Sequence, residues 1–254
     1  MLLVMHIGNY AISLGVYKNE KLVLNSGIST DRGRFPAQYA AELQSLFRFY
    51  EIDGVIDGAI ICSVVPELTG TLCGAIELAF KIRPVTVSPG IKTGLNIKTD
   101  NPAQVGADLV ATAVGAIAKH GAPCVIYSLS EVTTVSVIDF DGAFRGGAIC
   151  AGVRLSVESL EANTALLPNV ELEPSRELIG RNTADSMKSG AFFGAACLID
   201  GFGTRLSEQF PGCAHIVTGL YAKAVSPLCR LDVTMNEFLI FEGLLAIYKK
   251  NVVS

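Results

Sequence analysis

Residues 2–24 decide the fold, and their sequence is LLVMHIGNYAISLGVYKNEKLVL. The apolar run Leu2–Ile7 predicts a buried strand that ends in a tight turn at Gly8. A second strand is expected over Ala11–Tyr17, and the polar turn Lys18–Lys21 leads into a third. The stretch therefore predicts two successive hairpins at the start of the chain.

Helices and strands alternate after these hairpins. Residues 36–50 carry apolar side chains at helical spacing, with Pro36 suited to the first turn of a helix. Residues 58–65 have the pattern of a buried strand that stops at Pro66, and a helix is expected over 67–80. Alternation of this kind is typical of an α/β fold.

A second copy of the opening pattern follows. A helix is expected over 105–119 and a strand over 123–127. Residues 127–144 can be aligned with the first hairpin at one constant offset, which places Ser128 on His6. This match predicts a duplicated α/β fold.

The duplication gives an expected division of the chain into two lobes, 1–117 and 118–254, with dimerisation assigned to the second. Helices are expected over 153–166 and 183–209 in the second lobe. Gly201 and Gly203 are expected to interrupt the second of these helices, because glycine is a poor helix former.

Composition narrows the classes of function. Half of the 254 residues are apolar, the net charge is −4, and no dense Lys/Arg run occurs, which argues against nucleic-acid and anionic-membrane surfaces. No apolar run reaches the roughly 18 residues that a membrane span needs. The seven cysteines are scattered and never form C-x-x-C, so we expect reduced thiols rather than a disulfide framework or zinc site. Together these features predict a cytoplasmic protein.

Two lobes that each open with a hairpin resemble the actin-like (ASKHA, ribonuclease H-like) superfamily, which holds ATP in the cleft between its lobes. In such folds, glycine-containing turns offer backbone N–H groups to the phosphates, and one Asp in each lobe organises the metal.

More specific motifs occur in order along nearly the whole chain: His6–Tyr10, Ile28–Arg32, Ser63–Pro66, Lys92–Asn96, Asp100–Pro102, Gly106–Asp108, Gly146–Ile149 and Ile179–Thr183. In order and spacing they resemble the type III pantothenate kinases, also called the Bvg accessory factor family. The resemblance implies phosphorylation of pantothenate by ATP, with Mg²⁺ and a monovalent cation, at the first step of coenzyme A biosynthesis. It also implies a dimer whose pantothenate pocket lies at the subunit interface.

The resemblance assigns roles to individual residues. Gly106 and Asp108 belong to the pantothenate pocket, with Asp108 as the general base, and Thr183 reaches into the neighbouring subunit's pocket. The nucleotide-binding positions are Gly8, Asn9, Thr133, Thr134 and Gly219.

The first lobe departs from the family pattern at the metal end. The family opens with Asp-x-Gly-Asn-Thr, whereas this chain has His6 in place of the Asp and Tyr10 in place of the Thr. An imidazole cannot supply the hard anionic oxygen that Mg²⁺ prefers. The ring of Tyr10 also stands where a small hydroxyl would face phosphate.

The second lobe departs in the same way. The family's Asp-Phe-Gly-Thr turn becomes Ser128-Leu129-Ser130-Glu131, which removes a cation contact, adds a Cβ and places a negative charge near a polyanion. At ~4 Å such a like-charge contact would cost on the order of 4 kcal/mol, enough to weaken ATP binding roughly a thousandfold. Three further departures are Leu220 for a Gly, Leu109 for an Arg and Thr99 for a Tyr.

Several structural roles compete with the functional ones. His6 could simply be packed, Asp108 could be a surface or capping carboxylate, and Thr183 could cap its helix. Glu131 could bond to the amides of its own turn as an internal anion, or point to solvent.

Three functions remain open at this stage. The first is a catalytically degenerate subunit that completes the pantothenate pocket of an intact homologue in a heterodimer, with a homodimer of this chain as the other expected assembly. The second is an active pantothenate kinase with an altered metal mode. The third is a non-catalytic binding or regulatory protein.

Overall fold

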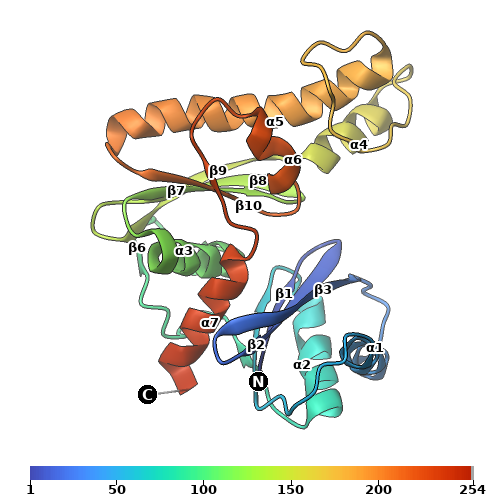
Figure 1. Ribbon diagram of the computed structural model, residues 1–254, viewed down its shortest axis with the longest axis vertical. Helices are drawn as coiled ribbons and strands as arrows, with labels where there is room; N and C mark the ends of the chain where they lie inside the picture. The colour runs from blue at the N-terminus through green and yellow to red at the C-terminus, as the bar shows by residue number, and fades with distance from the viewer. Residues whose placement is uncertain (253–254) are drawn as a thin grey trace. The chain divides into compact units, whose positions relative to one another are not determined.

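The computed structural model describes residues 1–252, which fold as two compact units. Unit 1 comprises residues 1–94 and 101–118 together with the C-terminal segment from Ile240. Unit 2 comprises Leu95–Asp100 and Lys119–Leu239. Each unit contains one sheet, and the elements of both are labelled in Figure 1.

The sheet of unit 1 has the strand order β3-β2-β1-β4-β5. Antiparallel pairing joins β1 (Leu2–Ile7), β2 (Ala11–Lys18) and β3 (Lys21–Ser29), which confirms the opening hairpins. Strands β4 (Gly58–Ser63) and β5 (Val85–Thr86) continue the sheet in parallel with β1.

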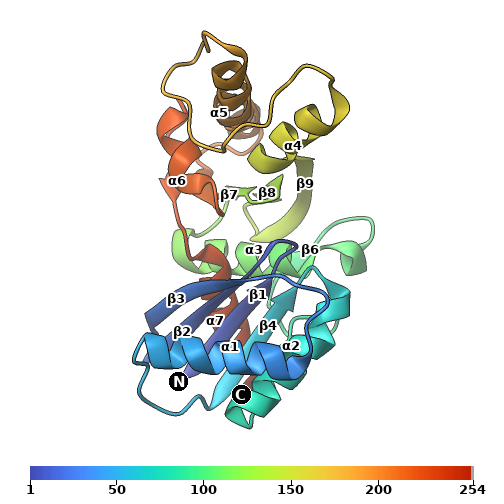
Figure 2. The same ribbon diagram turned by 90° about the vertical axis from the view of Figure 1, so that its right-hand side faces the viewer.

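Helices cover both faces of this sheet. Alternate residues of β1, including Leu3 and Met5, pack in one core with α1 (Pro36–Phe49) and α2 (Pro66–Phe80). These two helices can be followed along the sheet in Figure 2. On the other face lie α3 (Ala107–His120) and α7 (Leu239–Val252), which approach each other closely where Gly243 meets the backbone of Ala111.

Unit 2 repeats the same topology. Its sheet has the order β11-β10-β7-β8-β9-β6. The antiparallel strands β7 (Cys124–Leu129), β8 (Val132–Ile138) and β9 (Ala143–Ala151) correspond to β1–β3. The parallel strands β10 (Ala214–Thr218) and β11 (Thr234–Met235) correspond to β4 and β5, and β6 (Asn96–Ile97) is an addition. The duplication expected from one aligned hairpin therefore extends across the five-strand pattern.

Helices α4 (Val153–Asn163), α5 (Thr183–Gln209) and α6 (Ala222–Val225) belong to unit 2, and short 3₁₀ turns lie at Pro102–Gln104 and Ser226–Leu228. The expected interruption of α5 is wrong, because the helix is continuous from Thr183 to Gln209. A Cβ at Gly203 would lie 2.1 Å from Leu231 Cδ2. Packing against the following loop therefore explains this glycine, and tertiary contacts outweigh its weak helix propensity.

The expected domain ranges, 1–117 and 118–254, remain a prediction. The chain does pass from one unit to the other at Ala118/Lys119, but α7 returns to unit 1 and residues 95–100 belong to unit 2. None of the helices within residues 1–252 combines the length and the apolar character needed to cross a bilayer.

Candidate active site

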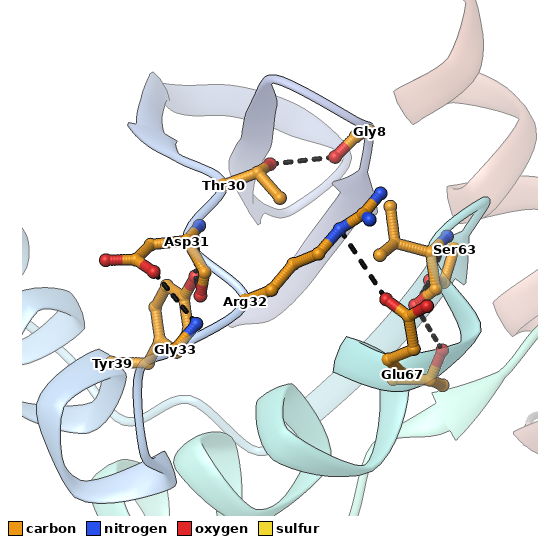
Figure 3. Close-up of polar contacts among 10 residues, drawn as sticks. Gly8, Thr30, Asp31, Arg32, Gly33, Tyr39, Ser63 and Glu67 are labelled. Carbon is orange, nitrogen blue, oxygen red and sulfur yellow. Dashed lines mark hydrogen bonds and ion pairs between the residues drawn. The ribbon is translucent and has the colours of Figure 1, made fainter.

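The turn after β1 is held in place by the end of β3. The Gly8 N–H donates to the Ala11 carbonyl at 3.0 Å, which closes the turn. Thr30 then binds the turn twice: its hydroxyl donates to the Gly8 carbonyl at 2.7 Å, and its N–H donates to the Tyr10 carbonyl at 3.0 Å. Figure 3 shows the Thr30 hydroxyl directed at Gly8. A fixed backbone turn is thus present at this expected phosphate position, although the Tyr10 side chain beside it is 52% exposed.

Asp108 lies near the carboxyl end of β4, in the first turn of α3. Burial raises the pKa of the Cys62 thiol well above its usual range, and the charge of Asp108 raises it further. Cys62 is paired in register with His6 on β1, so His6 and Asp108 both belong to this edge of the unit 1 sheet. A Cβ at Gly106 would come within 2.4 Å of Asp108 Oδ1, so the Asp108 carboxylate lies close to this glycine.

Two glycines pack closely against the turn after β7 in unit 2. A Cβ at Gly219 would lie 2.7–2.8 Å from backbone atoms of Leu129, and Gly219 has φ +96°. A Cβ at Gly152 would lie 2.3 Å from the Glu131 carbonyl oxygen. The structure therefore brings the expected nucleotide residue Gly219 against the Ser128–Glu131 turn. Thr133 and Thr134 follow in β8, both buried.

Glu131 does not act as an internal anion in this structure. Its side chain is partly buried, and its carboxylate has no hydrogen-bond or ion-pair partner among residues 1–252. Two residues beside the turn were not singled out as functional from the sequence. A hydrogen bond with Tyr221 raises the pKa of the Arg154 guanidinium, so Arg154 on α4 and Tyr221 after Gly219 lie together. The sequence offers little signal for this pair, because 67 positions separate its members.

The expected metal positions do not suit Mg²⁺. His6 and Ser128 stand at the ends of β1 and β7 and offer no carboxylate there. Over residues 1–252 there is no group of three or more His, Cys, Asp or Glu side chains arranged to hold a metal ion. His6 and Ser128 therefore do not supply the carboxylates through which the family resemblance implies that the metal is held.

Thr183 occupies the first turn of α5, but it does not cap the helix. The N-cap is Asn182, whose side-chain oxygen accepts the Asp185 N–H at 2.9 Å, so the capping role considered for Thr183 is wrong. Thr183 is exposed. It lines a cavity of about 390 Å³ between α4 and α5, together with Ser156, Val157, Leu160, Leu167, Ser186, Met187, Gly190 and Ala191.

A residue that departs from the family pattern meets a family-like segment in unit 2. Thr99, just after β6, lies with its methyl group 3.9 Å from the Cβ position of Gly146. The next residue, Gly147, passes so close to the Val135 carbonyl that a Cβ there would lie 1.8 Å from the oxygen. The Gly146–Ile149 segment is therefore constrained by backbone packing in the sheet.

Comparisons with known proteins identify the family of the chain. A family model described as type III pantothenate kinase matches residues 2–205. The type III pantothenate kinase of Halalkalibacterium halodurans is 37% identical over 258 residues, covering 99% of this chain and 100% of that protein. The one from Pelobacter propionicus is 38% identical over 253 residues, with 99% and 100% covered.

Solved structures support the fold. A Baf family transcriptional activator from Campylobacter jejuni has a TM-score of 0.61 at 15% identity, covering 99% of this chain and 100% of that one. An activator of 2-hydroxyisocaproyl-CoA dehydratase from Clostridium difficile, with bound ADPNP, has a TM-score of 0.55 at 11% identity, covering 97% and 93%. These likenesses concern the fold alone, which is the duplicated actin-like α/β fold. The family model and the full-length relatives confirm the resemblance, and the chain belongs to the type III pantothenate kinase family.

Proposed function

We propose that this chain is a catalytically degenerate subunit of a pantothenate kinase, which acts in coenzyme A biosynthesis as the partner of an intact homologue. In that dimer it completes the homologue's pantothenate pocket with Thr183. One observation carries the proposal. Thr183 is exposed on a helix that Asn182 caps, whereas the strands that lead into the chain's own two phosphate turns have His6 and Ser128 near their ends.

The impairment is argued from charge and space at the turns. Glu131 has no cation to balance it among residues 1–252, so its charge would repel a nucleotide phosphate bound at its turn. At the other turn the half-exposed ring of Tyr10 occupies space where the family has a small hydroxyl. Mg²⁺ and ATP would therefore be bound by the intact subunit rather than by this one.

The dimer is argued from an apolar surface of unit 2. Large apolar side chains are exposed on α4 and on the segment that leads to α5, namely Leu155, Leu160, Leu166, Leu178 and Ile179. Contiguous exposed apolar groups commonly mark an interface with another protein. An obligate-type interface of ~2,000 Å² or more would cover them.

A second function, an active kinase with an altered metal mode, has one observation in its favour. Asp108 is retained near the end of β4, beside a Gly8 turn that Thr30 holds in position. In the family the matching Asp takes the proton of the pantothenate hydroxyl, and the carboxylate of Asp108 could do so here. The loss of the family Arg at Leu109 weakens this alternative.

Purification of the chain alone and together with an intact homologue separates the two functions. We expect the isolated chain to show no pantothenate-dependent ATP turnover, and the mixed dimer to be active. An isolated chain that turns over ATP at a rate comparable with the mixed dimer would refute the degenerate-subunit proposal and support the second function. A failure of the two chains to associate at micromolar concentration would refute the partner role.

A further inference from the structure

The loop after β3 presents an exposed arginine on a rigid base. Tyr39 on α1 is fully buried, and its hydroxyl accepts the Asp31 N–H at 2.9 Å and donates to the Asp31 carbonyl at 2.8 Å. Both backbone polar groups of Asp31 are thus bound to a side chain that is fixed in the core. Arg32 follows directly, with 60% of its side chain exposed. An exposed side chain therefore starts from a backbone that cannot easily move.

The guanidinium of Arg32 is also oriented. Its Nε lies 3.5 Å from Glu67 Oε2, in the first turn of α2. Figure 3 shows the side chain extending from the end of β3 towards Glu67 and the end of β4 near Ser63. Exposed ion pairs contribute little to stability, so the main effect of this contact is directional. It occupies Nε and leaves the two Nη atoms without a partner among residues 1–252.

Among the nearby acidic groups, Glu67 contacts Arg32 itself and Asp31 is engaged elsewhere. The Asp31 carboxylate accepts the Gly33 N–H at 2.9 Å and lies 3.5 Å from Arg34 Nε. At the end of β1, His6 stands where the family has an acid. The start of α2 adds the positive end of a 15-residue helix whose N-cap residue, Val65, makes no side-chain capping bond.

We propose that Arg32 binds a phosphate group at this edge of the unit 1 sheet without a metal ion. Arg presents its two Nη groups as a fork that matches two oxygens of one phosphate. The contact with Glu67 is made by Nε and leaves that fork unpaired, and Tyr39 keeps its base in place. This inference goes beyond the proposed function, which depends on Thr183 in unit 2. The phosphate group is a free anion, and the terminal phosphate of a nucleotide is the competing source that the test distinguishes.

Calorimetric titration of the full chain tests this site, with inorganic phosphate in one arm and ATP in the other. EDTA is present throughout and the ionic strength is held constant. We expect saturable binding in the phosphate arm, weakened roughly tenfold or more by Arg32→Gln. Arg83→Gln is the matched control, because Arg83 is also an exposed arginine of unit 1, and it should leave binding unchanged.

Tyr39→Phe provides a second variant. It retains the buried ring and removes the hydroxyl, so binding should weaken although Arg32 is present. Thermal melting of each variant establishes that it is folded. Binding in the phosphate arm alone supports the free-anion assignment, whereas tighter, Arg32-dependent binding of ATP would overturn it. The inference is overturned if wild type shows no saturable binding in EDTA, or if Arg32→Gln and Arg83→Gln behave alike.

Discussion

The contribution of Thr183 to a partner's pocket can be tested by Thr183→Ala in the mixed dimer. If its hydroxyl donates or accepts one hydrogen bond with pantothenate, its loss costs about 0.5–1.5 kcal/mol, or roughly a two- to tenfold fall in kcat/KM. The structure indicates that this substitution should leave helix α5 intact. Asn182 still caps α5 through the Asp185 N–H, and alanine is a good helix former at the exposed position that Thr183 leaves.

The assay is steady-state kinetics of the mixed dimer, with the intact subunit held fixed. Asn182→Ala serves as a comparison variant that affects the helix itself, because loss of the cap should lower the free energy of unfolding by about 0.5–2 kcal/mol. Under the proposed function, Asp108→Ala in this chain should leave the mixed dimer's activity unchanged, because Asp108 belongs to the chain's own site in unit 1 and not to the partner's pocket. The argument is refuted if Asp108→Ala abolishes activity while Thr183→Ala has no effect, since this chain would then carry out the chemistry itself.

Three further predictions concern the nucleotide site and stability. Calorimetry at millimolar ATP–Mg²⁺ should show little binding to the isolated chain, and a micromolar dissociation constant for wild type would contradict this. Restoring five family residues together should improve binding, namely by His6→Asp, Tyr10→Thr, Ser128→Asp, Ser130→Gly and Glu131→Thr. Gly219→Ala should destabilise the protein by about 1–3 kcal/mol, because its Cβ would meet the Leu129 backbone at φ +96°. Gly212→Ala, at φ +77° in open space, should cost only about 1 kcal/mol, and equal urea midpoints for the two variants would rule out the packing argument. Burial lowers the pKa of His215 below its usual value near 6.5. As the pH drops through 6.5, the unfolded chain therefore binds a proton at this residue before the folded chain does. The free energy of unfolding should fall over this range. Urea unfolding at pH 7.5 and 5.5 should show this loss, and His215→Gln should reduce it.

The two nucleotide turns show how much of the site can be predicted from the sequence. That His6, Ser128 and Glu131 replace family residues is visible in the sequence, because strand–turn patterns and motif spacing place them at equivalent turns. Whether Glu131 binds its own turn could not be decided from the sequence. Side-chain partners depend on where the turn lies, and in the folded chain its carboxylate has none among residues 1–252.

Local pattern by itself determined most of the fold. Apolar alternation and prolines place β1, α1 and α2 closely, and one hairpin alignment was enough to predict the duplication. These signals are short-range, so the sequence contains them in full.

Tertiary structure alone decided the features that depend on distant partners. The close packing of Gly203 against Leu231 and the cap of α5 at Asn182 rather than Thr183 appear only in the folded chain. The orientation of Arg32 likewise needs Tyr39 and Glu67, which approach it only after α1 and α2 have packed on the sheet. No local propensity encodes such contacts, because each depends on residues that only folding brings together.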